Sequence, residues 1–434
     1  MSKKVLIISP HFPPVNAPDM HRVRQSLPFF KTYGWEATVL CVHPEHVEMA
    51  MDDMLVASVP TDVPVYIVKA FSTHYTRKLG LGNLGIRAFW HLFKKGNQLI
   101  KEEKYDLIYF STTVFASMPL GRLWKQKFNI PFIIDMQDPW RNDYYLSLPK
   151  SDRPQKFWFA YNLNKYLEHF TMQKVDGIIA VSGAYIESLK SRYPRVNALP
   201  CSVFTFGAHS KDMEISMSLN SEFVSYALDV NCINIVYAGA VPPNMLYAIE
   251  AFFIALKKGI NENSTFKQIR MHFLGTNYAV GESIKSVLKE LIDRYELSDY
   301  VFEKSERLPY FQVLNLLQNS QLAVLPGTLD SNYTASKLYP YIMSKIPILA
   351  IFHKDSSVTS ILKELNYGKA VAFDENTSMD VLSQNVFKDL CEFLDNGQNN
   401  SGFNGHEFKK YKSDHLTKMQ CDFFNTVLNS SNQV

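Results

Sequence analysis

Two segments of the sequence join a short apolar run to polar groups that could hold an anion. In the first, the run at 5–9 enters a Pro-rich turn and then a stretch that carries Arg22 and Arg24. In the second, an apolar run at 322–325 leads through a polar loop to Lys337. A helix start after such a turn presents free backbone N–H groups, and a nearby cation adds charge-assisted hydrogen bonds to a phosphate. Both segments therefore have the composition of a phosphate site. The alternative for the first is an ordinary strand-to-helix turn with surface arginines.

The second segment predicts a helix start near 336–339. Thr334 and Ser336 are residue types that cap helices, and Pro340 belongs in a first turn because an interior proline costs about 3 kcal/mol. We expect a diphosphate to bind here through Thr334, Ala335, Ser336 and Lys337, with Arg22 adding charge. The alternative is an ordinary cap with a solvated Lys337.

A carboxylate, Asp138, follows the apolar run at 131–135 and lies beside Trp140 and Arg141. Ligands of open α/β sheets bind outside the carboxyl ends of the strands, so Asp138 could accept a proton or bind a sugar hydroxyl. An Asp before Pro is also common in turns and caps, which is the alternative. The chain has no G-x-G-x-x-G fingerprint, and its carboxylates lack metal-binding spacing. We expect no metal and no cofactor.

Alternating apolar runs and amphipathic stretches must position these residues. Apolar runs without polar alternation predict strands buried in a parallel sheet, and the stretches between most of them can form helices, which indicates a doubly wound α/β fold. Strands are expected at 5–9, 37–41, 65–69, 106–111, 131–135, 177–181, 233–238, 269–274, 322–325, 347–351 and 370–373. Helices are expected at 20–33, 87–101, 155–174, 184–192, 245–257, 283–295, 310–318, 356–365, 381–394 and 406–428.

Two such domains fit the length of 434 residues. The weakly structured stretch 197–220 predicts the boundary, which gives domains at 1–205 and 206–405, and a last helix at 406–434 that crosses back onto the first domain. Residues 1–200 hold 25 Lys and Arg against 17 Asp and Glu, a net charge of +8, whereas 201–434 hold 20 against 25, a net charge of −5. The two halves are thus expected to contact different partners.

The composition excludes several classes of protein. Charged residues make up 20% and hydrophobic residues 46%, which is typical of a globular protein. No apolar run approaches the ~18 residues that span a bilayer, and the apolar run at 5–8 is too short for a secretory signal. The five scattered cysteines include no C-x-x-C, which favours a reducing cytoplasm.

Taken in order, several segments resemble the GT-B glycosyltransferases of family 4. The opening FPP segment, the strand that ends in D-M-Q-D-P-W, and VDGIIAVS at 175–182 have counterparts in that family. So do IVYAG at 235–239, RLPY at 307–310, and SKLYPY at 336–341 followed by SKIPILA. The resemblance covers nearly the whole chain. It implies two Rossmann-like domains facing across a cleft.

The resemblance also implies donor-binding residues. Gly239 would allow close approach of the donor, and Glu306, Arg307 and Leu308 would border the nucleotide base. Asn16 and Tyr333 are expected to contact the nucleotide or sugar, and Asp330 to replace a lost carboxylate. Asp138 is the expected catalytic residue.

The sequence departs from the family pattern at three donor contacts. The Glu-x7-Glu pair is absent, because Asn332 and Pro340 stand at those positions. The usual Gly pair after the first strand is replaced by V-N-A-P at 15–18, and 240–245 carries no Arg or Lys. We interpret the chain as a subfamily with a rearranged donor site.

The implied function is transfer of a sugar from a nucleotide-sugar to a hydroxyl acceptor. The enzyme would be a metal-independent, retaining, hexosyltransferase-type (EC 2.4) transferase of bacterial cell-surface polysaccharide or glycolipid synthesis. Its partners would be the nucleotide-sugar and a glycan or lipid-linked acceptor. Nucleic acid is not expected, because the net charge is small and no recognised module occurs.

A basic, aromatic stretch at 74–104 suggests where the protein acts. Its cations and aromatic side chains suit an anionic membrane surface, where each cation contributes about 1 kcal/mol. We therefore expect a cytoplasmic protein with peripheral contact at the inner face of the membrane. The alternative is a solvated helix with a buried aromatic face.

Three other functions fit parts of the pattern. A non-catalytic nucleotide-sugar-binding subunit, or pseudoenzyme, would explain the missing carboxylates. A nucleotide-sugar epimerase of the same fold would need no acceptor. An exported two-domain sugar-binding protein fits the architecture, but the missing signal sequence speaks against it.

Overall fold

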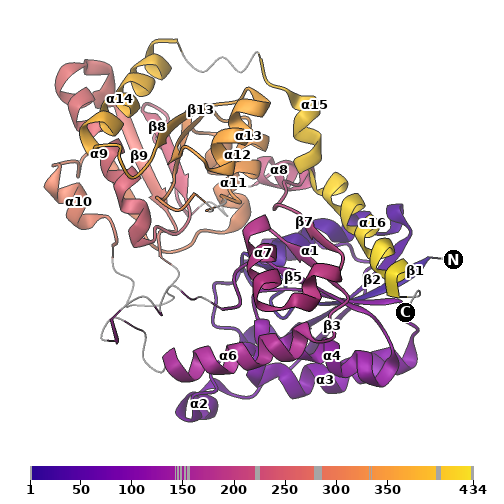
Figure 1. Ribbon diagram of the computed structural model, residues 1–434. Helices are drawn as coiled ribbons and strands as arrows, with labels where there is room; N and C mark the ends of the chain where they lie inside the picture. Colours follow the sequence, from indigo (N-terminus) through magenta and orange to yellow (C-terminus); the bar gives the residue numbers. More distant parts are fainter. Residues whose placement is uncertain are drawn as a thin grey trace. The chain divides into compact units, whose positions relative to one another are not determined.

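The computed structural model describes residues 2–141, 143, 146, 149, 150, 153, 157–219, 225–277, 286–331, 333, 335–396 and 402–431. The chain forms two units: residues 1–206 with 413–434, and residues 207–412. Each unit is built on its own parallel sheet (Figure 1).

The N-terminal unit contains a seven-stranded sheet in the order β3-β2-β1-β4-β5-β6-β7. Every strand pairs in parallel, and β1 and β4 are neighbours, so the strand order reverses between them. That reversal is the position at which open α/β sheets bind ligands. The strands are β1 (Lys3–Ile8), β2 (Trp35–Val42), β3 (Val65–Val68), β4 (Leu107–Ser111), β5 (Phe132–Met136), β6 (Gly177–Ala180) and β7 (Cys201–Val203).

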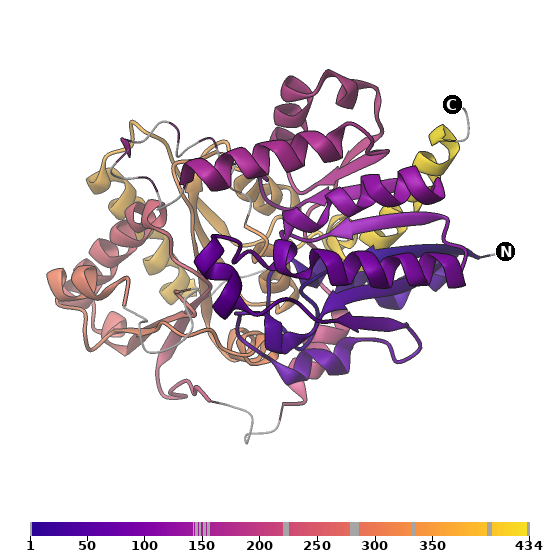
Figure 2. The same cartoon turned by 90° about the horizontal axis from the view of Figure 1, so that it is seen from below.

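Helices cover both faces of this sheet. Three of them, α3 (Leu84–Glu102), α4 (Pro119–Phe128) and α6 (Phe157–Met172), lie side by side on the face seen in Figure 2. The last helix, α16 (Ser413–Ser431), packs against α1 (Met20–Ser26) within the same unit. Phe424 of α16 contacts Trp35 and Tyr109 of the sheet, with ring centroids 5.3 and 5.1 Å apart. The unit also contains α2 (Thr73–Thr76) and α7 (Gly183–Arg192).

The C-terminal unit repeats the architecture with a six-stranded sheet in the order β10-β9-β8-β11-β12-β13. Its strands are β8 (Ile233–Ala238), β9 (Ile269–Leu274), β10 (Val301–Lys304), β11 (Leu322–Pro326), β12 (Ile348–His353) and β13 (Lys369–Phe373). One face packs on α9 (Leu246–Glu262) and α14 (Met379–Asn396) through a large apolar core.

The remaining helices of this unit are α8 (Ser210–Met217), α10 (Lys289–Arg294), α11 (Tyr310–Gln318), α12 (Leu338–Met343), α13 (Ser357–Leu365) and α15 (Gly405–Phe408). Figure 1 shows α11, α12 and α13 on the side of the sheet opposite α9 and α14.

The fold prediction of two doubly wound parallel sheets is confirmed. The stretch 197–220 is not weakly structured as expected, because it contains β7 and the whole of α8, while 220 lies outside the described residues. The units divide after Phe206 and Lys412, against expected boundaries at 205 and 405. The expected helix at 20–33 ends at Ser26, and two short 3-10 turns follow it.

Candidate functional site

Four adjacent strands of the C-terminal unit place polar groups at their carboxyl ends. Gly239 follows β8, Gly275 follows β9, Arg307 follows β10, and Lys337 lies in the loop after β11. Backbone hydrogen bonds tie these loops together, since the Gly239 N–H donates to Leu274 O and the Gly275 N–H to Lys304 O, both at 2.7 Å. The sheet thereby holds two cations and two glycines at one edge.

Lys337 carries a charge that no acid among the described residues neutralises. Its ammonium donates to the Tyr237 hydroxyl at 3.4 Å and lies over that ring, and within the described residues it has no carboxylate partner. The residue as a whole is partly exposed, but protein atoms surround the ammonium. That desolvation, together with the positive charge of Arg307, lowers the pKa of Lys337 to about 8. An anion bound here would relieve both effects.

Gly239 makes room for this ammonium. A Cβ at that position would overlap the Cε and Nζ atoms of Lys337. The backbone of Gly239 also has φ of +146°, which side-chain-bearing residues rarely adopt. Gly239 was expected to allow close approach of the donor, whereas in the structure its missing side chain makes room for Lys337.

Two tyrosines fix the segment that carries Lys337. Tyr341, buried in α12, accepts a hydrogen bond from the Ala238 N–H at 2.8 Å. Tyr237 donates its hydroxyl proton to Ala240 O at 2.7 Å. The Tyr341 contact joins α12 to the end of β8, and the Tyr237 contact holds the turn that follows β8. Only the apolar strand pattern, which places 237–238 at a strand end, hinted at these partners.

The predicted helix cap is wrong. Helix α12 begins at Leu338, and its N-cap is Lys337, without a side-chain hydrogen bond. Because α12 has only six residues, its N-terminus by itself is not an anion-binding site. The cationic side chains therefore supply the positive charge here. Ser336 is partly exposed and Ala335 is buried, while Thr334 and Asn332 lie outside the described residues.

The other predicted donor residues have mixed surroundings. Glu306 is exposed and pairs with Lys304 at 2.7 Å, whereas Leu308 is buried. Asp330 is exposed and accepts a hydrogen bond from the Tyr333 N–H through its backbone oxygen at 3.1 Å. The Tyr333 ring stacks on Phe352.

Arg22 does not present a free guanidinium. It is only 7% exposed, and its Nε lies 2.7 Å from Asp135 Oδ2. Its terminal nitrogens donate to Phe204 O at 2.8 Å and Thr205 O at 3.2 Å. The predicted role in diphosphate binding is thus replaced by a structural one, because the guanidinium neutralises a buried carboxylate. Arg24 is also fully buried and donates to Ser58 Oγ.

Asp135 is the centre of a buried network that the sequence did not reveal. Its Oδ2 also accepts from Tyr109 at 3.1 Å, Ser111 at 2.9 Å and Gln137 at 2.9 Å. The network joins the ends of β4 and β5 to α1. The sequence showed a polar residue at the end of each of two apolar runs, Ser111 and Asp135. It did not indicate which cation would pair with them.

Asp138 follows β5 at the carboxyl edge of the N-terminal sheet and is exposed. Crowding by protein atoms and the negative charge of Asp19 raise its pKa to about 6. Asn16 is buried, and its side-chain oxygen has no hydrogen-bond partner among the described residues. Both residues belong to the N-terminal unit, and they lie in the loops that follow β5 and β1.

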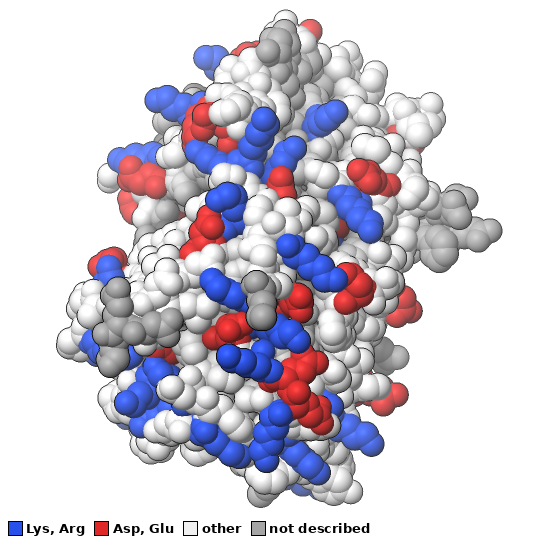
Figure 3. Space-filling view, turned by 90° about the vertical axis from the view of Figure 1, so that its right-hand side faces the viewer, with Lys and Arg blue, Asp and Glu red and all other residues white. Residues whose placement is uncertain are grey.

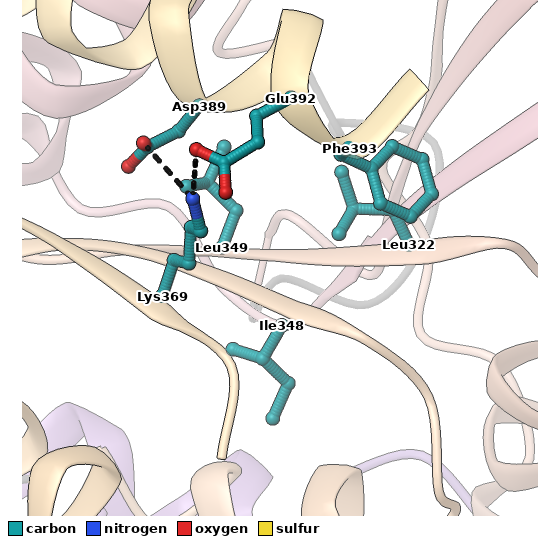
Figure 4. A pocket seen from close by; sticks show the side chains of 7 residues that line it. All are labelled: Leu322, Ile348, Leu349, Lys369, Asp389, Glu392 and Phe393. Atoms are coloured by element: carbon teal, nitrogen blue, oxygen red, sulfur yellow. Dashed lines mark ion pairs between the residues drawn. The ribbon is translucent and has the colours of Figure 1, made fainter. Parts of the chain in front are cut away.

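A pocket opens at the other edge of the C-terminal sheet (Figure 4). It is lined by Leu322, Ile348 and Lys369, which begin β11, β12 and β13, together with Leu349, Asp389, Glu392 and Phe393. Lys369 pairs with Asp389 at 3.6 Å and with Glu392. Its charge is neutralised, unlike that of Lys337.

Two kinds of feature are absent from the described residues. No group of three His, Cys, Asp or Glu in that part of the chain is arranged to hold a metal ion. No described helix has both the length and the apolar character needed to cross a bilayer.

Comparisons with known proteins agree with this architecture. Residues 31–201 match the family model described as a glycosyl transferase 4-like domain. No curated protein matches the sequence. Many solved structures match the fold at low sequence identity.

Three of these structures cover nearly the full chain. Sucrose-phosphate synthase from Thermosynechococcus elongatus is 12% identical with a TM-score of 0.63, over 99% of this chain and 100% of that one. HepE from Anabaena, solved with UDP-glucose, is 14% identical with a TM-score of 0.55, over 99% and 98%. A UDP-N-acetylglucosamine 2-epimerase described as putative, from Listeria monocytogenes, is 13% identical with a TM-score of 0.54, over 97% and 95%.

The matched domain lies in the N-terminal unit, and the likeness to whole enzymes extends through both units. Residues 31–201 are therefore similar to a glycosyl transferase 4-like domain, and the chain has the GT-B fold.

Proposed function

We propose that the protein transfers a sugar from a nucleotide-sugar to a hydroxyl acceptor, without a metal. The observation that carries the proposal is the cationic edge of the C-terminal sheet, where Lys337 has no acid partner among the described residues and Arg307 lies close enough to lower its pKa. Such a site gains most from a group with two negative charges. A departing nucleoside diphosphate is that group, and fixed cations stabilise its developing charge.

The role of each predicted residue follows from this proposal. Lys337 binds the diphosphate, Gly239 keeps the ammonium in place, and Glu306 to Leu308 border the base. Asp138 holds a hydroxyl of the acceptor or the sugar. Three further features rest on the family resemblance alone: retention of the anomeric configuration, a hexosyl donor, and a place in bacterial polysaccharide or glycolipid synthesis. NMR of the first-formed product tests retention.

Thermal unfolding with EDTA against UDP, GDP, ADP, dTDP, CMP and their sugars is the experiment that tests donor binding. A ligand specific to the folded state stabilises it by about 2.7 kcal/mol at about one hundred times Kd. We expect a shift with one nucleotide class, and Lys337→Ala should lose most of it. Lys354→Ala is the matched control, because its exposed ammonium pairs with Asp374 in the same unit. A wild-type protein that responds to none of the panel would instead favour a pseudoenzyme.

A nucleotide-sugar epimerase is the second candidate, and the likeness to the Listeria structure favours it. The two functions differ in whether an acceptor is needed. Incubation with the nucleotide-sugar alone, followed by product analysis, distinguishes them. A new nucleotide-sugar isomer would indicate epimerisation, whereas an unchanged donor would count against it.

We further propose a peripheral contact with anionic membranes at the cytoplasmic face. On α2, α3 and the turn between them, Tyr75 is 71% and Trp90 is 59% exposed, and Lys78, Lys94 and Lys101 are exposed. Arg87 is buried and bonds backbone oxygens, so it adds nothing to this surface. On the face that Figure 3 presents, cations and carboxylates are interspersed. Sedimentation with phosphatidylglycerol vesicles tests the contact, and Trp90→Ala should weaken it.

A further inference from the structure

The amino group of Lys337 is held by neutral groups of its own unit. Its Nζ donates to the Tyr237 hydroxyl at 3.4 Å and lies 5.3 Å from the centroid of that ring. It also packs against the backbone of Gly239, where an added Cβ would overlap Nζ. Within the described residues no carboxylate pairs with it. The contacts therefore fix the position of the amine without stabilising its positive charge.

The backbone places Arg307 close to this amine. The Gly239 N–H donates to Leu274 O at 2.7 Å, and at Gly275, the next residue, an added Cβ would lie 3.4 Å from the Cα of Arg307. Burial of the ammonium and the positive charge of Arg307 together lower the pKa of Lys337 to about 8. A desolvated lysine beside another cation acts as a nucleophile near neutral pH, because part of the population has lost its proton.

Lysines of the same unit that pair with acids lack this property. A hydrogen bond to Asp374 raises the pKa of Lys354. Burial disfavours the charge of Lys369, but its bond to Glu392 outweighs that effect, and its pKa is raised as well. Both side chains stay protonated where Lys337 does not. A reagent that requires a neutral amine therefore distinguishes Lys337 from these two lysines.

We propose that Lys337 is a carbamylation site, where dissolved carbon dioxide adds reversibly to the amine and thereby blocks binding of the donor diphosphate. The product is an anion, so the positive charge of Arg307, which disfavours the ammonium, favours the carbamate. An imine formed with an aldehyde would carry no negative charge and would gain nothing from Arg307. The regulatory effect rests on the proposed donor site, whereas the modification itself does not.

The addition needs only the amine and carbon dioxide. The lone pair of neutral Nζ forms a bond to the carbon, and the electron pair of one C=O π bond moves onto its oxygen. The nitrogen then releases one proton to solvent, which leaves a carbamate anion. Tyr237 accommodates both forms, because its own proton is donated to Ala240 O at 2.7 Å and its oxygen accepts the N–H that remains on Lys337. The site thus exchanges a cation for an anion, which repels a diphosphate.

Carbon NMR of the full chain with isotope-labelled bicarbonate, in equilibrium with carbon dioxide, tests the modification. We expect a carbamate signal that is lost in Lys337→Arg, because guanidinium does not lose its proton. Lys354→Arg is the matched control and should keep the signal. The α-amino group of the chain, with an ordinary pKa of about 8, also reacts. Trapping the carbamate as its alkyl ester and mapping the peptides by mass assigns the signal to residue 337.

Dissolved carbon dioxide should also weaken nucleotide binding. Only the fraction of protein without carbamate binds, so modification of half of it increases the apparent Kd about twofold. Calorimetric titration with the nucleoside diphosphate selected by the thermal panel measures this, at constant pH and matched ionic strength, with and without carbon dioxide. Lys337→Arg should have the same Kd in both conditions. Saturating nucleotide should in turn remove the Lys337 carbamate.

Failure of the carbamate and failure of the proposed function give different results. A wild-type protein that binds a nucleotide but yields no trapped carbamate on the Lys337 peptide would overturn the modification alone, and this result needs no variant to fold. Equal weakening of nucleotide binding in Lys337→Arg would indicate competition by the bicarbonate anion and would overturn the regulation. A trapped Lys337 carbamate in a protein that binds no nucleotide would support the modification and overturn the proposed donor site.

Discussion

At the scale of single residues, the fold leaves one ammonium in an unfavourable place. Lys337 is held by Tyr237 and Gly239 rather than by an acid. This environment lowers the pKa of the ammonium. The contacts with Tyr237 and Gly239 keep the side chain in place. The same feature makes binding of an anion sensitive to pH and to the size of the residue at 239.

Affinity for a nucleotide-sugar should fall as the pH rises through the pKa of Lys337. That pKa is lowered to about 8, so the ammonium is charged below this value and neutral above it. The diphosphate of a nucleotide-sugar keeps its charge over this range, and the apparent Kd should therefore increase by about tenfold at pH 9. Calorimetric titration between about pH 7 and pH 9.5 checks it. Lys337→Arg should abolish the dependence, since guanidinium stays charged. A wild-type Kd that is constant over this range would contradict the assignment.

Gly239→Ala should impair donor binding without a donor contact being removed. A Cβ would overlap the end of Lys337, and the φ of +146° adds strain of about 1–3 kcal/mol. We expect a lower melting temperature and a weaker thermal shift with the nucleotide. Gly183→Ala is the control, because open space surrounds that glycine. A Gly239→Ala variant with wild-type affinity would show that the ammonium need not occupy its observed position.

The sequence predicted Lys337 but not its surroundings, and the reason is distance along the chain. Residue type and a nearby helix start pointed to Lys337, which is local information. The contacts with Gly239 and Tyr237 join residues about one hundred positions apart. The predicted phosphate-binding role of Arg22 was wrong for the same reason, because nothing near Arg22 in the sequence shows that Asp135 will neutralise it.

At the scale of elements, the apolar pattern found the central strands and missed two at the edges. β8 and β9 were predicted with their observed bounds, because buried parallel strands are continuous apolar runs. β7 and β10 lie at the outer ends of their sheets. Val203 of β7 and Phe302 of β10 are exposed, and polar residues flank them, so these strands lack the pattern.

Arg22→Met should lower the free energy of unfolding more than substitution of an exposed cation does. The change leaves Asp135, which is fully buried, without its cation at the junction of β4, β5 and α1. Removing one partner of a buried pair costs about 3–5 kcal/mol. Urea unfolding measures it, with the double variant Arg22→Met, Asp135→Asn expected to recover part of the loss. Lys31→Met, which breaks an exposed pair with Asp62, is the control and should change little. Equal midpoints for the two single variants would contradict the structural role of Arg22.

At the scale of the whole chain, the last helix completes the first unit. Helix α16 contributes Phe423, Phe424 and Val427 to the core that β1, β2 and β4 form. The chain thus returns to the N-terminal unit after finishing the C-terminal one. One helix was expected over 406–428, whereas the structure divides that span into α15, a 3-10 turn and α16. The partners of α16, Trp35 and Tyr109, became visible only in the structure.

Phe424→Ala should therefore loosen the strands at the opposite end of the sequence. Phe424 is fully buried against Phe30, Trp35 and Tyr109, and truncating a buried Phe costs about 3–5 kcal/mol. Hydrogen exchange should quicken in β1, β2 and β4 while β8, β9 and β11 keep their protection, because Phe424 belongs to the core of the first unit. Met419→Ala, on an exposed face of the same helix, is the control. Uniform loss of protection in both sheets, or none in either, would contradict the division of the chain into these two units.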